Sequence, residues 1–186
     1  MFFIYYVFME MNVASNIQPT GKELFFERDE IIVSKTNPKG HITYANDVFM
    51  RLAGYSEREI LGAPHSIIRH PHMPRCIFKL LWDTLKSKKE IFAYVMNMSA
   101  TGDHYWVLAH VTPTFDGEGN VTSYHSNRRL PNRKTLDEII IPLYKQLLDE
   151  EQKYPNKKEG MQKSFEMLTN LIDEKGKTYD EFILSL

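Results

Sequence analysis

Residues 91–129 read IFAYVMNMSATGDHYWVLAHVTPTFDGEGNVTSYHSNRR, and this stretch decides the fold. Residues 91–98 and 104–114 are rich in β-branched and aromatic side chains, and residues 121–129 form a third extended run. Clusters of Ser, Thr, Gly, Asp and Asn separate the runs, as at the turns of antiparallel hairpins. The stretch therefore predicts three consecutive antiparallel strands.

The chain upstream of these strands predicts a hairpin followed by helices. Residues 31–33 and 41–44 are short strand-like runs joined by a turn that contains Pro and Gly. The apolar spacing then becomes helical: one helix ends at Gly54, a capping box begins another at Ser56, and Pro74 lies in the first turn of a longer one. Five antiparallel strands with helices packed on one face make an α+β fold.

The carboxy-terminal segment, 132–186, has no strand signals and is rich in Lys and Glu. A capping box at Thr135 predicts a helix with a kink at Pro142, and another capping box at Thr178 predicts a short last helix. Between them, apolar residues at helical spacing over 161–172 predict a helix with one apolar stripe. We expect these helices to cover an apolar surface.

Composition excludes several classes of protein. The 186 residues carry 23 basic and 24 acidic side chains, so no global charge attracts nucleic acid or an anionic membrane. The single cysteine, Cys76, excludes an internal disulfide and a cysteine-based metal site, and we expect it to be a small buried side chain. The basic residues from Arg128 to Lys134 are interpreted as a solvated junction. We expect a cytoplasmic chain with no nucleic-acid partner.

The chain begins with an apolar run, 1–9, with no basic residue before it. A membrane span needs about 20 apolar residues, and a secretory signal needs a positive start and a cleavage site. We therefore expect the run to pack on the domain or on a second subunit, with no direct membrane insertion. The alternative is that translation starts at Met9 or Met11.

Flat and polarizable side chains are abundant: 12% of the residues are aromatic, and there are 9 Met and 7 His. They can build a core of large residues, or they can line a pocket for a flat cofactor. No catalytic triad order, nucleotide-binding glycine loop or paired-carboxylate site occurs, so we expect no catalytic residues and no enzyme activity. His70 and His72 lie only two residues apart, without a cysteine or acidic cluster nearby, which argues against a metal site.

Five motifs follow one another in the central region: ITYANDVF (42–49), AGY (53–55), LGAPH (61–65), IRHPHMP (68–74) and GDHYWV (102–107). Over residues 29–129 they closely resemble the PAS sensor domain of the bacterial aerotaxis receptor and energy-taxis family. The resemblance implies the PAS fold, a five-stranded antiparallel sheet with short helices on one face, here followed by a helical segment. We expect a lead-in (1–28), a PAS sensor domain (29–131) and a helical extension (132–186).

In that family the domain binds FAD non-covalently and reports its redox state to a chemoreceptor-type signalling partner. The resemblance therefore implies a redox or energy sensor, and we also expect a homodimer. Six residues match positions associated with the flavin cavity: Asn46, Arg69, His70, Phe78, Trp82 and Asn97. The chain departs from the family pattern where His72 replaces an acidic residue and where Ile91-Phe92 replaces a tryptophan.

Several of these candidates also have a purely structural interpretation. Arg69 can bind a phosphate or carboxylate of a ligand, or it can pair with a local acid. Asn46 can face the flavin or cap the helix that follows it, and Trp82 can be plain core. Asn97 is a hydrogen-bonding candidate only if it faces the sheet interior.

Two other functions stay open at this point. Some PAS domains hold haem by one axial histidine, which His65, His70 or His72 can supply. Alternatively, side chains fill the aromatic cavity and the domain is a cofactor-free module for dimerisation or docking.

Overall fold

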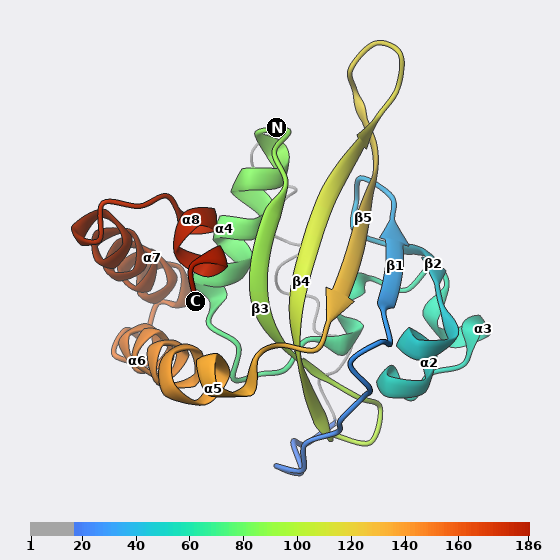
Figure 1. Ribbon diagram of the computed structural model, residues 1–186, viewed down its shortest axis with the longest axis horizontal. Coiled ribbons are helices and arrows are strands. Elements are labelled where there is room, and N and C mark those ends of the chain that lie inside the picture. The colour runs from blue at the N-terminus through green and yellow to red at the C-terminus, as the bar shows by residue number, and fades with distance from the viewer. Residues whose placement is uncertain (1–16) are drawn as a thin grey trace.

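The computed structural model describes residues 17–186 and contains a five-stranded antiparallel sheet (Figure 1). The strands lie in the order β2-β1-β5-β4-β3. Their bounds are Ile32–Thr36 for β1, Ile42–Ala45 for β2, Ile91–Met98 for β3, His104–Phe115 for β4 and Val121–Arg129 for β5. The predicted hairpin and the three long strands are confirmed. The first and last strands of the chain meet in the middle of the sheet, where Ser34 lies opposite Ser126.

Short helices lie on one face of the sheet, called the inner face below: α2 (Asp47–Ala53), α3 (Glu57–Ile60), the 3-10 turn η1 (His65–Ile68) and α4 (Arg75–Lys86). Gly54 ends α2 with a left-handed φ of 71°, a conformation that favours glycine. The capping box at Ser56 is confirmed. Pro74 is the N-cap of α4 and so precedes its first turn.

Alternation along the strands decides which side chains reach the inner face. In β5 the buried residues are Tyr124, Ser126 and Arg128, and the residues between them are more exposed. In the neighbouring β1, Ser34 and Thr36 are buried on the same face. Polar side chains therefore lie at the centre of the sheet, beneath the helices.

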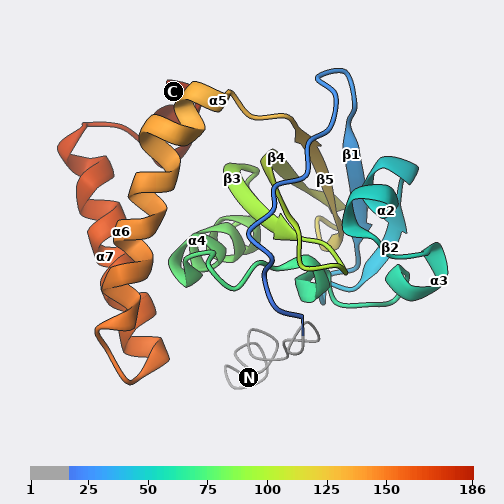
Figure 2. The ribbon, with the colours of Figure 1, turned by 90° about the horizontal axis from the view of Figure 1, so that it is seen from below.

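The carboxy-terminal helices pack beside the β3 edge of the sheet (Figure 1, Figure 2). They are α5 (Arg133–Thr135), the π-helical stretch η2 (Leu136–Ile140), α6 (Ile141–Gln152), α7 (Lys157–Glu174) and α8 (Tyr179–Leu184). α6 and α7 pack as a pair, α7 also packs on α4, and α8 packs on β3. The expectation that these helices cover apolar surface is confirmed, because Leu147, Leu168 and Phe182 are buried.

Side chains of this extension occupy the free edge of β3. The Phe92 N–H donates to Asp180 Oδ1 (3.2 Å). The Tyr144 hydroxyl donates to the Tyr94 carbonyl (2.7 Å). An uncovered edge strand is a template for pairing with another chain, so the extension protects this edge.

Glu151 of α6 joins three helices. Its Oε1 accepts from the Cys76 N–H (3.0 Å) in the first turn of α4 and from the Ser164 hydroxyl (2.8 Å) of α7. The N-cap of α4, Pro74, makes no side-chain cap hydrogen bond, so Glu151 supplies an acceptor that this helix start lacks. The helix dipole also favours a carboxylate at this position. The extension thereby holds α4 in place from its outer side.

The start of the extension differs from the prediction. Asn132, and not Thr135, caps the first helix, because Asn132 Oδ1 accepts from the Thr135 N–H (3.0 Å). The Thr135 hydroxyl instead donates to the Leu186 carbonyl (3.0 Å). A π-helical stretch precedes Pro142, which lies in the first turn of α6, and the wider turns of this stretch accommodate a residue that has no N–H. The capping box at Thr178 is confirmed.

The lead-in runs beside the turn between β3 and β4. The Thr20 N–H donates to the Gly102 carbonyl (3.0 Å), and the Leu24 N–H donates to the His104 carbonyl (2.7 Å). The apolar run 1–9 lies outside the described residues. Across residues 17–186, the helices are too short or too polar to cross a membrane.

Replacing Gly160 by Ala tests the contact between α6 and α7. A Cβ at Gly160 would lie 2.3 Å from the Glu151 carbonyl oxygen, so the two helices would have to separate. We expect the Gly160→Ala variant to lose about 1–3 kcal/mol of unfolding free energy in urea denaturation, although Ala favours a helix by about 1 kcal/mol. Gly117→Ala is the control, because within residues 17–186 no atom other than those of the adjacent residues lies within 4 Å of the Cβ position there. Wild-type stability of Gly160→Ala would contradict this close packing.

Candidate functional site

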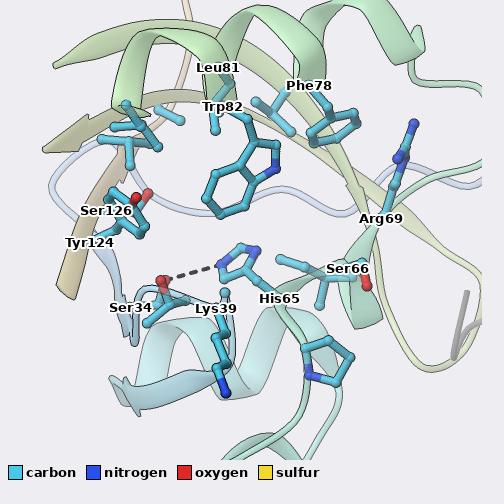
Figure 3. A pocket seen from close by; sticks show the side chains of 18 of the residues that line it. Ser34, Lys39, His65, Ser66, Arg69, Phe78, Leu81, Trp82, Tyr124 and Ser126 are labelled. Atoms are coloured by element: carbon cyan, nitrogen blue, oxygen red, sulfur yellow. Dashed lines mark hydrogen bonds between the residues drawn. The ribbon is translucent and has the colours of Figure 1, made fainter. Parts of the chain in front are cut away.

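A cavity of about 750 Å³ lies between the inner face of the sheet and α4. Strands β1, β3, β4 and β5 line one side, and η1 and α4 line the other. Trp82 and Phe78 project from α4 and face His65 and Ser34 across the cavity (Figure 3). Ligand pockets commonly have volumes of about 300–1,000 Å³, so this cavity is large enough for a small organic ligand.

Four of the six predicted site residues line the cavity: Arg69, Phe78, Trp82 and Asn97. Phe78 and Trp82 lie one helical turn apart on α4. The Trp82 ring meets the Tyr124 ring of β5 edge to face, with 5.6 Å between the ring centroids. Part of the aromatic content of the sequence is therefore concentrated on the cavity wall.

Arg69 follows η1 and contributes a half-buried cation. Its guanidinium lies over the Phe78 ring, 4.1 Å from the centroid. Burial and the nearby charge of Arg75 lower the pKa of Arg69 to about 10, and the carboxylate of Glu151 opposes this shift. Arg69 therefore stays charged at neutral pH.

Asn46 is not among the residues of 17–186 that line the cavity, and its contact with a flavin stays a prediction. Its Oδ1 accepts from the Phe49 N–H (3.1 Å) at the start of α2 and from the Val33 N–H (3.0 Å) of β1. Its Nδ2 donates to the Ile31 carbonyl (2.8 Å). These contacts match the capping interpretation, in which Asn46 caps α2 and ties it to β1.

His70 is also not among the residues of 17–186 that line the cavity, and its contact with a flavin stays a prediction. It is buried, its Nδ1 accepts from the His72 N–H (3.1 Å), and its ring packs against those of His72 and His104. Burial lowers the pKa of His70 to about 4, with further contributions from the other two histidines. His70 holds the loop before α4 by a backbone contact.

Sequence reasoning does not single out four further residues that line the cavity: Ser34, Tyr124, Ser126 and Arg128. A period of two along 124–128 is the signal that could have found three of them, since alternate residues of a strand share one face. Arg128 is 4% exposed, so the interpretation of 128–134 as a solvated junction is wrong at this position. The next residue, Arg129, is exposed.

Arg128, His65 and Ser34 form a hydrogen-bonded cluster at the cavity wall. Nη2 of Arg128 donates to Ser34 Oγ (2.9 Å) and to His65 Nε2 (2.6 Å). Ser34 Oγ and His65 Nε2 lie 3.2 Å apart (Figure 3). Burial and the charge of Arg128 lower the pKa of His65 to about 3. His65 is therefore neutral at physiological pH, and its Nε2 accepts from Arg128.

Four buried polar atoms of the cavity lining have no hydrogen-bond partner among residues 17–186: Ser66 Oγ, Asn97 Nδ2, Ser126 Oγ and Arg128 Nη1. Leaving a buried polar group unpaired costs about 1–3 kcal/mol, and more when the group is charged. Acceptor atoms of a ligand, or ordered water, can satisfy these groups. Asn97 meets the sequence-based condition for a binding role, because it faces the sheet interior.

The departures from the family pattern lie outside the described cavity lining. His72 is exposed on the loop before α4. Ile91 is buried, and Phe92 stacks on His110 at the opposite face of the sheet, with 4.2 Å between the ring centroids. Cys76 is buried, as expected, and burial raises the pKa of its thiol to about 12.

Haem ligation would require a histidine nitrogen that faces the cavity. Of the three candidates, His65, His70 and His72, only His65 belongs to the described lining, and Arg128 already donates to its Nε2. Within residues 17–186, no group of three or more His, Cys, Asp or Glu side chains can hold a metal ion.

Helix α7 also reaches the cavity. Met161 lines it, although this residue belongs to the carboxy-terminal extension. Lys79 Nζ of α4 lies over the Phe165 ring of α7, 4.3 Å from the centroid. The extension therefore contacts both the cavity and the helix that carries Phe78 and Trp82.

Known proteins share this sequence pattern. The profile of a family described as PAS fold matches residues 42–128. The chain is 40% identical over 121 residues to the aerotaxis receptor of Escherichia coli (strain K12), covering 64% of this chain and 23% of the receptor. It is 29% identical over 143 residues to the nitrogen fixation regulatory protein of Klebsiella pneumoniae, covering 69% of this chain and 29% of that protein. The chain thus spans about a quarter of the length of these relatives.

Solved structures share the architecture. A light-oxygen-voltage domain studied with a flavin analogue gives a TM-score of 0.52 at 22% identity, covering 62% of this chain and 87% of that chain. The dark structure of the blue-light photoreceptor Aureochrome1 LOV gives 0.52 at 21% identity, covering 62% and 85%. At such identities the likeness concerns the fold alone.

The neutral, half-buried His65 predicts a fold that loses stability in acid. As the pH falls below about 6.5 the unfolded chain protonates this histidine, whereas in the folded protein its pKa is about 3, so the free energy of unfolding decreases. Between about pH 6 and pH 4, we expect the free energy of unfolding to fall less steeply in the His65→Gln variant than in the wild type, by up to about 1.4 kcal/mol per pH unit. Urea denaturation at each pH measures this slope. Parallel stability curves for variant and wild type would contradict this assignment.

Proposed function

Residues 42–128 form a PAS domain, and from this premise we propose that the chain is a redox or energy sensor that binds a flavin, specifically FAD, in the cavity. The observation that carries the proposal is the lining of the cavity, which combines aromatic side chains with unpartnered hydrogen-bonding groups. A flavin matches both, because its fused ring is flat and one end carries carbonyl oxygens. Among proteins of this fold, a light-oxygen-voltage domain has been studied with a flavin analogue.

The residues present fit such a ligand. Trp82 and Phe78 offer aromatic surface against which a flat ring can pack. Asn97 can donate to a ring carbonyl, and Arg69 can bind a phosphate. When bound, a flavin supplies one- and two-electron chemistry, while the protein binds it, orients it and excludes water.

The cavity favours this proposal over the two alternatives. A haem group would need His65 Nε2, to which Arg128 already donates. A cofactor-free module is expected to fill its interior with side chains, whereas the described residues enclose about 750 Å³. Apolar side chains in the cavity would also leave Asn97 Nδ2 and Ser126 Oγ without a hydrogen-bond partner.

We also propose that the extension carries the output. A change in the ligand's hydrogen bonding at Asn97 or contacts at Trp82 can shift α4, and Lys79 and Met161 connect α4 and the cavity to α7. A small difference in free energy between two such arrangements is enough to change their populations. We further propose a chemoreceptor-type signalling partner, a cytoplasmic location and a homodimer; the similarity to a protein named aerotaxis receptor supports a role in signalling.

The absorption spectrum of the full chain, purified in the dark, tests the proposal. We expect the bands of oxidised flavin, and we expect the ligand released by heat to chromatograph as FAD. A haem Soret band would contradict flavin binding, and a colourless protein that takes up no added FAD would contradict both cofactors.

Substitution of the two tryptophans locates the ligand. Trp82→Ala removes the aromatic surface in the cavity, and we expect flavin affinity to fall about tenfold or more, equivalent to about 1.4 kcal/mol. Trp106→Phe is the matched control, because Trp106 packs against Tyr144 on the opposite face of the sheet. The measurement is fluorescence titration of ligand-free protein with FAD. Equal losses in both variants, or a loss only at Trp106, would place the ligand elsewhere.

A further inference from the structure

Arg128 is a buried cation without an acidic partner. The side chain is 4% exposed, and no carboxylate of residues 17–186 forms an ion pair with it. Buried charges are normally paired, because removal from water strongly disfavours an isolated ion. Arg128 therefore lacks the compensation that a purely structural cation would have.

The neighbours of Arg128 hold it in one orientation and leave one amine free. Nη2 is used by Ser34 and by the neutral ring of His65, whereas Nη1 has no partner within the described chain. The guanidinium also lies 5.3 Å from the centroid of the Phe49 ring. These contacts orient the group without neutralising it.

The surroundings of Arg128 favour a ring acceptor over a phosphate. The charge of Arg128 acts on Tyr105, which lies opposite Asn97 in the β3–β4 pair, and both residues are buried. The Asn97 side chain lies close enough to the Tyr105 hydroxyl to act on its pKa, and neither this hydroxyl nor Asn97 Nδ2 makes a well-formed hydrogen bond among the described residues. Two exposed lysines belong to the cavity lining, Lys39 on the loop between β1 and β2 and Lys86 at the end of α4, and a hydrated phosphate can remain in water beside them.

We propose that Arg128 is a ligand-binding residue whose Nη1 donates to an electron-rich acceptor on the flavin ring, and that the ligand-free fold retains this unpaired cation at the expense of stability. The proposal rests on flavin binding. Replacing Arg128 by an apolar residue removes the buried charge, and Ser34 and His65 remain close enough to bond to each other. Replacing Arg128 by an apolar residue should therefore lower the affinity for the ligand and raise the stability of the ligand-free protein.

Two neighbouring arginines of β5 provide the experiment. Arg128→Met is compared with Arg129→Met, which changes an exposed residue on the other face of the same strand. Urea denaturation gives the midpoint of each ligand-free protein, and fluorescence titration gives the affinities for riboflavin, FMN and FAD. For Arg128→Met we expect a midpoint at or above that of the wild type and an affinity at least about tenfold lower for all three flavins. For Arg129→Met we expect wild-type values.

Other outcomes overturn the proposal in distinguishable ways. Suppose that Arg128→Met has a lower midpoint or fails to fold, and that a folded Arg128→Lys variant keeps its ligand affinity. Arg128 then stabilises the fold and does not bind the ligand ring. Losses for FMN and FAD but not for riboflavin would place a phosphate against Arg128. If the wild type binds none of the three flavins, the proposed function itself fails. If the wild type and Arg128→Met bind them equally, only the assignment of Arg128 fails.

Discussion

The position of α4 depends on one buried carboxylate. Glu151 accepts from the backbone of Cys76 at the start of α4 and from Ser164 of α7, and Gly160 lets α6 and α7 approach closely enough for this arrangement. α4 carries Phe78 and Trp82, so the aromatic side of the cavity is placed by the carboxy-terminal extension as much as by the sheet. The extension is therefore a structural part of the site, and a contact there can respond to what the cavity holds.

The cavity exists because small and polar side chains occupy the inner face of the sheet. Ser34, Ala109 and Ser126 lie where larger apolar residues would fill the space beneath α4. A packed core would be more stable, since voids and unpaired polar groups both weaken a fold. The arrangement is consistent with a protein in which a bound ligand supplies the missing contacts, and Asn97 and Arg128 are the clearest examples.

Much of the fold could be predicted from local sequence signals. The bounds of β3 and β5 follow from their composition and turns, and the ends of α2 and α8 follow from Gly54 and the capping box at Thr178. Capping was less predictable where two acceptors competed: Asn132 lies three residues before Thr135 and takes the cap. Local signals predict that Pro142 affects the helix, but they do not predict the π-helical stretch that lies before this residue.

The site was only partly predictable, for physical reasons that differ between residues. Phe78 and Trp82 share a helix face, so their joint placement follows from helical spacing. An asparagine before a helix can either cap that helix or contact a ligand, and the sequence does not distinguish these roles. In the structure, the Val33 and Phe49 N–H groups donate to Asn46 Oδ1, which makes it a helix cap. Arg128 was misassigned because adjacent arginines suggest solvent exposure, whereas strand alternation buries one and exposes the other.

A crystal structure of the full chain with its bound ligand tests the central claim most directly. We expect a flat ring inside the cavity, packed against Trp82, with acceptor atoms within hydrogen-bond distance of Asn97 Nδ2 and Arg128 Nη1. Electron density for the ligand outside this cavity, or a cavity closed by side chains with Asn97 and Arg128 paired to other protein groups, would contradict it.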